Sequence, residues 1–275
     1  DTAARLIAPR LSEALGQPVI VDNRGGAGGN LAMETIARAQ PDGYSIAQVS
    51  TIQAMNMSFY RSVRFDLTRD IAPIGELLVS TTVLVVHPSV PARTPQELIA
   101  YARANPGRIN FVSGTNGATG YYLKHLAGLD MEIVVYKGTP PAVTDMIAGQ
   151  GHVMVTTAAS VMQFVRQGKL RAVAVTSSTQ GSSLYPELPP LAEAVPGFEN
   201  PMWYGVVAPA RTPPAVVARL NGELARILQS AELQQRLAAI GFEVSTGNPQ
   251  QFGRRIETEV KKWPKVVEMM GGPTH

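Results

Sequence analysis

"TTVLVVHPSV", residues 81–90, is the most strongly strand-like stretch of this chain. β-Branched residues fill its first half, and Pro88 and Pro91 end it. "MWYGVVAPA", residues 202–210, has the same character and also ends at a proline. Between them lies an almost complete alternation of helix and strand patterns. We predict that the chain crosses between two lobes here, near residues 83–87 and 203–208.

The crossings divide the chain into two predicted α/β lobes. Residues 1–82 and 208–275 form a discontinuous lobe one, and residues 83–207 form lobe two. A chain of 275 residues is long enough for two domains of moderate size. The fold class predicted from these patterns is therefore α/β with two lobes, a cleft and two hinge connections.

Composition excludes several functional classes. Hydrophobic residues make up 45% of the chain and charged residues 16%, as in a soluble globular protein. The net charge is only +3 and no Lys/Arg run exceeds two residues, which argues against nucleic acid as a partner. Cysteine is absent, so disulfides, thiolate metal sites and cysteine nucleophiles are excluded, and an oxidising compartment such as the periplasm is compatible. No apolar run is long enough for a spanning helix.

A glycine-rich turn follows the first predicted strand. "PVIVDN" (18–23) predicts a buried strand, "RGGAGG" a turn, and "NLAMETIARAQ" a helix with Asn30 as its N-cap. A further strand pattern follows, so this part predicts a βαβ unit in a parallel sheet. A dinucleotide fingerprint fits poorly, because Leu31 stands where the third glycine belongs and Asp42 precedes a strand. No Gly-Lys-Ser/Thr sequence is present, which excludes a P-loop.

Catalytic and metal motifs are weak. The four histidines, His87, His125, His152 and His275, are not spaced as a metal pair. Gly-x-Ser-x-Gly is missing, although a Ser–His–Asp triad assembled in space stays open at this point. We therefore predict no catalytic residue, no metal and no cofactor.

"FVSGTNGATGYYLKHLAGLD", residues 111–130, is a strand end, a run of small polar residues and a helix. Backbone N–H groups and hydroxyls at a helix N-terminus can hold a carboxylate without a formal positive charge. An ordinary N-cap with a glycine turn is the plainer alternative. The ligand-binding residues predicted in this loop are Ser113, Gly114, Thr115, Asn116, Gly117, Ala118 and Thr119.

Two more loops follow strand patterns, at the sheet edge where α/β proteins bind ligands. Tyr136 and Lys137 precede the helix pattern "TPPAVTDMI". Lys137 is either a cation beside helical N–H groups or a surface lysine. Ser50, Thr51 and Gln53 follow a strand in lobe one. We predict that all five contact the ligand.

The chain resembles the TctC/Bug-type receptors, the periplasmic solute-binding proteins of tripartite tricarboxylate transporters. The resemblance runs nearly end to end and rests on five stretches: "VDNRGGAGGNLAMETIARAQPDGYSI", the 111–130 loop, "VVYKGTPPAVTDMIAGQ", "GKLRAVAVTSS" and "WYGVVAPARTPPAVVARLN". It implies a type II periplasmic binding protein (Venus flytrap) that holds a carboxylate between its lobes. One carboxylate would be held by the Ser113–Thr119 loop and by a facing loop that follows the first strand.

Three departures from the family pattern bear on the site. Only the ending of the facing loop, Asp1 to Arg5, matches the family. We therefore expect the first strand of lobe one to be missing through truncation or disorder. We also expect Asp1 to border the site. A histidine that the family often has is absent near Ser50–Ala54. Thr156 and Thr157 stand where the family often has Asp-Asn, which favours a second carboxylate or a neutral polar end over an ammonium group.

The resemblance implies that the protein captures a small carboxylate (a dicarboxylate, tricarboxylate or aromatic acid) in the periplasm. It would act as a monomer, deliver the ligand to transporter membrane subunits, and perform no chemistry. Two alternatives stay open from the sequence: an α/β enzyme acting on a small anion, and a ligand-sensing input protein.

Overall fold

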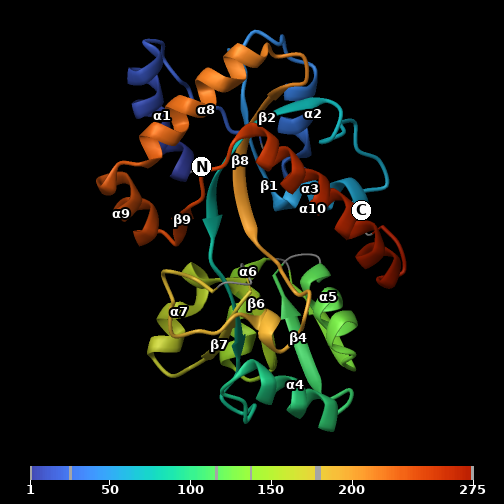
Figure 1. The fold of residues 1–275 in the computed structure, drawn as a ribbon. Coiled ribbons are helices and arrows are strands. Elements are labelled where there is room, and N and C mark those ends of the chain that lie inside the picture. Colours follow the sequence, from blue (N-terminus) through green and yellow to red (C-terminus); the bar gives the residue numbers. More distant parts are fainter. Residues whose placement is uncertain (1, 25–26, 115–116, 137, 177–180, 274–275) are drawn as a thin grey trace. The chain divides into compact units, whose positions relative to one another are not determined.

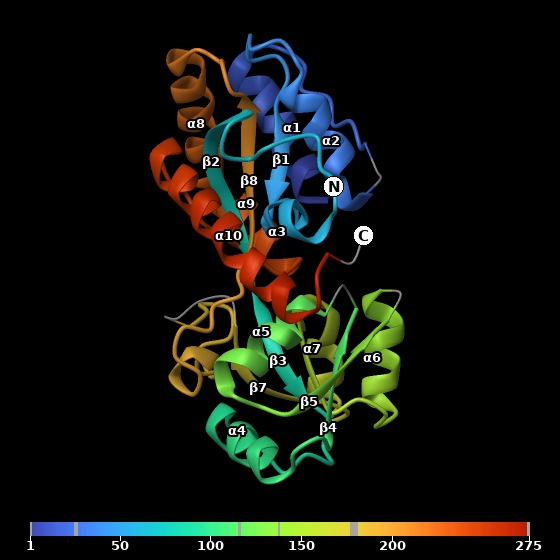
Figure 2. The same cartoon turned by 90° about the vertical axis from the view of Figure 1, so that its right-hand side faces the viewer.

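The computed structural model describes residues 2–24, 27–114, 117–136, 138–176 and 181–273. It divides into two compact units, one formed by residues 1–79 and 203–275 and the other by residues 80–202. Each unit has its own sheet flanked by helices (Figures 1 and 2). The α/β class predicted from the sequence is confirmed. Among the described residues, no helix has the length and apolar character needed to cross a membrane.

Unit 1 (residues 1–79 and 203–275) contains a four-stranded sheet in the order β1-β8-β2-β9. Its strands are β1 (Ala47–Ser50), β2 (Ile71–Ser80), β8 (Met202–Pro209) and β9 (Phe242–Val244). Its helices are α1 (Thr2–Leu15), α2 (Asn30–Ala37), α3 (Thr51–Phe59), α8 (Pro214–Leu228), α9 (Ala231–Ala239) and α10 (Pro249–Met269).

Alternating side chains of β8 divide the core of unit 1 into two layers. Val206 and Ala208 pack with α1, α8 and α9, whereas Trp203 and Val207 pack with α2, α3 and α10. Period-two alternation of a strand explains the division, because successive side chains point to opposite faces of the sheet.

The predicted βαβ unit at the start of the chain is wrong in two respects. "PVIVDN" is not a strand in the described structure; Val19 N–H instead donates to Ser12 Oγ of α1 (2.8 Å), and Ile20 is 85% exposed. β1 pairs antiparallel to β8, so the predicted parallel pairing is wrong for this strand. Asn30 also differs from its prediction as N-cap: Gly29 caps α2, and Asn30 Oδ1 accepts from Asn56 Nδ2 (2.8 Å). Val19 packs against the core beside α1 without a partner strand, whereas Ile20 is exposed; an apolar run without a neighbouring strand has no ladder to join, which explains the first difference.

Unit 2 (residues 80–202) contains a five-stranded sheet in the order β5-β4-β6-β3-β7. Its strands are β3 (Thr82–Val86), β4 (Ile109–Ser113), β5 (Met131–Val135), β6 (Val153–Thr157) and β7 (Arg171–Val175). Its helices are α4 (Pro95–Ala104), α5 (Ala118–Ala127), α6 (Thr139–Ile147) and α7 (Ala158–Arg166).

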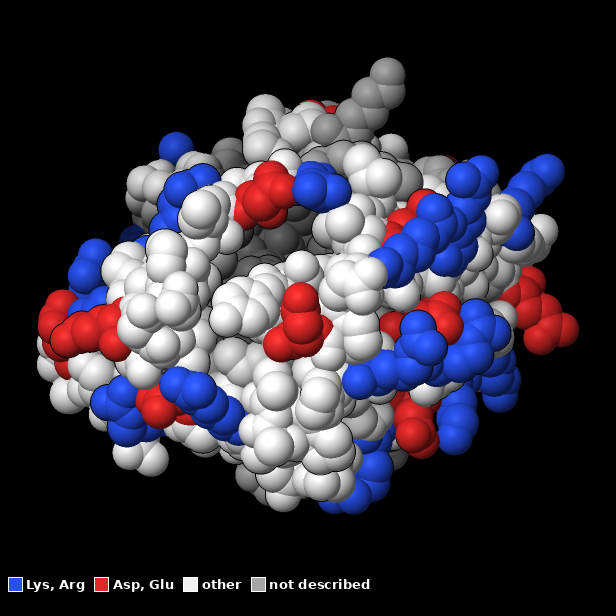
Figure 3. Space-filling model, turned by 90° about the horizontal axis from the view of Figure 1, so that it is seen from above, with Lys and Arg blue, Asp and Glu red and all other residues white. Residues whose placement is uncertain are grey.

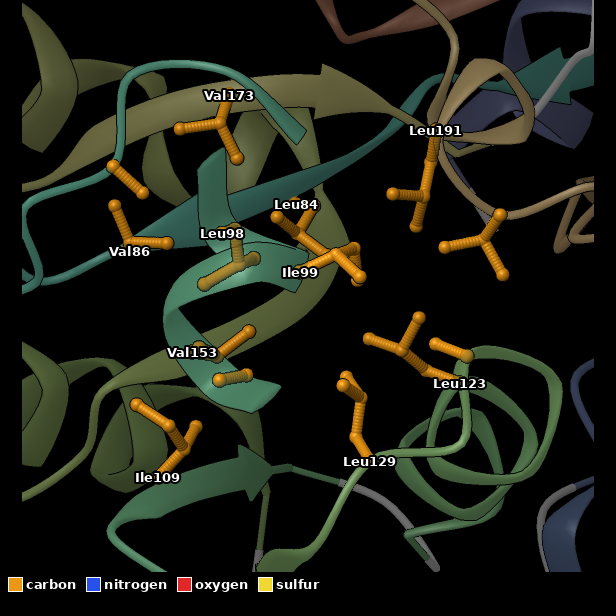
Figure 4. Packing of buried hydrophobic residues seen from close by; sticks show 14 of the residues in the cluster. Leu84, Val86, Leu98, Ile99, Ile109, Leu123, Leu129, Val153, Val173 and Leu191 are labelled. Carbon is orange, nitrogen blue, oxygen red and sulfur yellow. The ribbon is translucent and has the colours of Figure 1, made fainter. Parts of the chain in front are cut away.

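The strand-like stretch at residues 81–90 contains β3, a buried inner strand of unit 2. Leu84 and Val86 face a core shared with α4 and α5, seen from close by in Figure 4, whereas Val83 and Val85 face α6 and α7. All five residues of β3 are buried, as expected of a strand with helices on both faces.

Candidate functional site

The strand directions in unit 2 bring several loops to one edge of the sheet. β4 is parallel to β5 and β6, and β3 is antiparallel to both β6 and β7. The carboxyl ends of β4, β5, β6 and β7 therefore meet the amino end of β3. Ligands of open α/β sheets bind at this edge. We call it the carboxyl edge; its described residues are Ser113, Gly114, Gly117–Thr119, Tyr136, Thr156, Thr157, Thr176, Thr82 and Asn200.

The loop between β4 and α5 is held against the start of α6. A Cβ added to Gly114 would lie 2.5 Å from both the Cα and the N of Thr139, so only glycine fits there. Ser113 is buried, and its carbonyl accepts from Tyr136 N–H (2.8 Å). Gly117 caps α5 in the left-handed conformation (φ 80°), and Ala118 is fully buried. Thr115 and Asn116, also predicted to bind ligand, lie outside the described residues.

The loop between β5 and α6 adds Tyr136 to this edge. Its hydroxyl donates to Asp145 Oδ2 (2.8 Å), and this hydrogen bond, with burial and the nearby carboxylate charge, raises the pKa of Tyr136. Gly138 precedes α6 with φ 119°, a conformation that favours glycine. Lys137 and Asp1 lie outside the described residues, so their predicted ligand contacts stay predictions.

Thr156 and Thr157 end β6 and are both half-buried. Thr157 Oγ1 pairs with Ser160 Oγ of α7 (2.8 Å), and Thr156 lies opposite Val83 in the sheet. With α5 and α6, α7 is the third helix that begins at this edge. Three helix N-termini favour negative charge without any formal cation.

Three side chains at the carboxyl edge were not predicted from the sequence: Thr82, Thr176 and Asn200. All three are at least nine-tenths buried, and they bond to one another and to Thr119. Thr82 and Thr176 could have been found as hydroxyls flanking strand patterns. Asn200 follows a Pro/Ser-rich connection and carries no sequence signal of its own.

The predicted residues of unit 1 lie at the start of α3, and their side chains bond internally. Ser50 Oγ bonds to Gln53 Oε1 (2.8 Å) and accepts from Ile52 N–H (3.3 Å). Thr51 is buried and its hydroxyl accepts from Trp203 N–H (3.2 Å). Gln53 Nε2 donates to the carbonyl of Gly28 in the glycine turn (2.9 Å). Whether these residues also contact ligand stays a prediction.

Within the described part of the carboxyl edge, no histidine lies beside the serine and threonine hydroxyls. His87 and His152 lie at the opposite edge of the sheet, at the end of β3 and before β6, and His125 is exposed in the last turn of α5. Among the described residues, no group of three or more His, Cys, Asp or Glu side chains could hold a metal ion.

Several charged side chains elsewhere are paired with opposite charges. A hollow of about 450 Å³ in unit 1 is lined by Arg10 and Arg226, but these bond to Glu232 (3.1 Å) and Glu223 (2.7 Å). On the face seen in Figure 3, Lys and Arg are interspersed with Asp and Glu. Neither feature concentrates positive charge. Neither is therefore a better candidate for an anion-binding site than the helix N-termini of the carboxyl edge.

Comparison with solved structures defines the class of protein. A Rhodopseudomonas palustris protein solved with adipate is 32% identical, with a TM-score of 0.78 over 99% of this chain and 93% of its own. The R. palustris protein MatC, solved with bound malate, is 27% identical, with a TM-score of 0.75 over 97% of this chain and 93% of its own. The fold is that of the periplasmic binding proteins, as predicted.

The family follows from the sequence. The model of the tripartite tricarboxylate transporter family receptors (TctC) matches residues 3–271. Protein BugT of Bordetella pertussis is 32% identical over 98% of this chain and 85% of its own length. A UPF0065 protein of Pseudomonas sp., from the tcbD-tcbE intergenic region, is 34% identical over 97% of this chain and 81% of its own. The chain belongs to the tripartite tricarboxylate transporter receptor family, a family of solute-binding receptors.

Proposed function

We propose that this protein captures a small carboxylate in the periplasm and delivers it, as a monomer, to the membrane subunits of a tripartite tricarboxylate transporter. The observation that carries the proposal is the carboxyl edge of unit 2. There, three helix N-termini and the side chains of Thr119 and Thr156 offer neutral donors. Relatives solved with adipate and malate support a dicarboxylate as the ligand class.

Neutral donors suit a carboxylate for a physical reason. Each hydrogen bond to a charged group stabilises by roughly 1.5–3 kcal/mol, so a few of them hold the anion without a lysine or arginine. Asp145 is bonded to Tyr136 of this edge. With threonines at 156 and 157, the described residues that make up the carboxyl edge include no Asp or Glu to pair with a ligand ammonium, so we propose dicarboxylates over amino acids.

A thermal-shift screen of the full-length protein tests the proposal. The panel is adipate, malate, citrate and benzoate, with glutamate as the amino acid and putrescine as a cationic control. A true ligand present at a hundred times its Kd stabilises the folded state by about 2.7 kcal/mol. We expect at least one carboxylate to raise Tm and putrescine to leave it unchanged. No stabilisation by any carboxylate would refute the proposal, and tight binding of glutamate without any dicarboxylate would refute its finer part.

A further inference from the structure

A directed chain of hydrogen bonds runs along the carboxyl edge of unit 2. Thr176 Oγ1 donates to Thr82 Oγ1 (2.8 Å), and Thr82 Oγ1 donates to the carbonyl of Asn200 (3.1 Å). Asn200 Nδ2 then donates to Thr119 Oγ1 (3.2 Å). These four residues follow β7, begin β3, precede β8 and lie in the first turn of α5, elements labelled in Figures 1 and 2.

The direction of the chain follows from how many protons each group has. A threonine hydroxyl has one proton to donate and two lone pairs to accept. Thr176 and Thr82 are 2% and 3% exposed, so each commits its single proton inside the protein. Because Thr82 donates to Asn200, it can only accept from Thr176.

Hydrogen bonds hold the backbone of Asn200 at both its N–H and its carbonyl. Its N–H donates to the carbonyl of Thr176 (2.8 Å), and its carbonyl accepts from Thr82. With 9% exposure, its side chain has little freedom to turn away from α5. The amide of Asn200 is therefore held in place before any ligand arrives.

Thr119 receives the end of this chain. One of its lone pairs is occupied by the Asn200 amide, so its own proton must point elsewhere. Among the described residues, that proton has no hydrogen-bond acceptor, and Thr119 is only half-buried, in the first turn of α5. The hydroxyl is thus set as a donor at a helix N-terminus, where negative charge is favoured.

We propose that Asn200 is a positioning residue that orients the Thr119 hydroxyl as a dedicated donor to the ligand carboxylate. The inference rests on the proposed function. A carboxylate, which only accepts, takes the Thr119 proton. An ammonium group could use only the second lone pair of Thr119 and would leave that proton without an acceptor, so this arrangement of uncharged groups favours carboxylates over ammonium groups.

We call the orientation of the Thr119 hydroxyl by Asn200 the relay. A double-mutant cycle measured by calorimetry with adipate tests it. The variants are Thr119→Val, Asn200→Ala and the pair. Thr144→Val is a control, because Thr144 is an exposed threonine of α6 whose hydroxyl donates to the carbonyl of Pro140. We expect each single change at 119 or 200 to weaken binding about tenfold or more, as for loss of a charged hydrogen bond. If Asn200 acts through Thr119, the double variant binds no more weakly than Thr119→Val alone.

Two conservative variants guard against a merely structural effect. Thr119→Ser keeps the hydroxyl and should bind adipate within a few-fold of the wild type. Asn200→Asp keeps the side-chain size, but its ionised carboxylate only accepts and would take the Thr119 proton. It should lose at least as much affinity as Thr119→Val while remaining folded in a ligand-free melt.

The outcomes separate the relay from the proposed function. Wild-type binding with strictly additive losses at 119 and 200, or wild-type affinity in Asn200→Asp, would overturn the relay and leave the receptor function standing. Failure of the wild type to bind any carboxylate would overturn both.

Discussion

The same sequence pattern, a strand followed by small polar residues and a helix, gives two different structures in the two units. At the start of α3 in unit 1, the side-chain oxygens of Ser50, Thr51 and Gln53 all bond within the protein. At the start of α5 in unit 2, Thr119 is half-buried and its proton has no acceptor among the described residues. The difference supports the N-terminus of α5, rather than that of α3, as the proposed ligand-binding surface, because a hydroxyl donor is left over there after capping.

The largest expected effect comes from the packing of the loop before α5. Gly114→Ala places a Cβ 2.5 Å from the Thr139 backbone, which cannot move without shifting the start of α6. We expect destabilisation of about 1–3 kcal/mol from overpacking and loss of ligand-induced stabilisation. Urea unfolding with and without adipate measures both.

Gly222→Ala is the matched control. Gly222 lies inside α8 with nothing within 4 Å of an added Cβ, and alanine is the better helix former by about 1 kcal/mol. This variant should keep or gain stability and bind normally. Equal behaviour of the two glycine variants would show that the loop is not tightly packed.

A smaller effect on stability is expected at the N-terminus of α3. Ser50 caps α3 in a capping box with Gln53, so Ser50→Ala should lower the free energy of unfolding by about 1 kcal/mol. Because its hydroxyl is already bonded internally, we expect little change in adipate affinity. A loss of affinity comparable with that of Thr119→Val would contradict the contrast and place Ser50 among the ligand contacts.

The opposite edge of unit 2 should add a weak pH dependence. His152 Nδ1 accepts from Asn110 N–H (2.9 Å), and burial, followed by the nearby His87, lowers the pKa of His152 below its usual 6.5. The unfolded chain therefore binds this proton more readily than the folded one. The contribution of His152 to the free energy of unfolding is fully present above pH 6.5. It is lost as the pH falls from 6.5 towards the lower pKa of the folded protein.

His152→Asn removes this titration. The variant should show a flatter Tm profile between pH 7 and 5 than the wild type. An unchanged slope would mean that other groups account for the acid sensitivity.

Local rules predicted much of the fold. A threonine N-cap followed by proline is typical of a helix start, and α4 begins in this way at Thr94 and Pro95; α10 likewise begins with Pro249 after an asparagine N-cap. The strands β3 and β8 were found from β-branched runs that end near prolines. In contrast, Ile71–Ser80 was not predicted as a strand, because Pro73 and Gly75 interrupt its pattern. The glycines have a structural reason: a Cβ added at Gly205 would lie 2.7 Å from Gly75 O, because the two backbones approach closely there.

The site was predictable only in part, for a related reason. The loop at Ser113–Thr119 has a local signature of small donors between a strand and a helix. Asn200 contacts Thr119 and Thr82, residues 81 and 118 positions away, so nothing near it in sequence marks it. Similarly, the Thr51 hydroxyl accepts from Trp203 N–H, 152 positions away, which periodicity cannot show.

The most direct test of the account is a calorimetric titration of adipate into the wild type, Thr119→Val and Thr144→Val under the same conditions. The account predicts one site per chain in the wild type and in Thr144→Val, and binding weakened about tenfold or more in Thr119→Val. Equal affinity of the two threonine variants would contradict the claim that leftover neutral donors at the carboxyl edge of unit 2 hold the ligand.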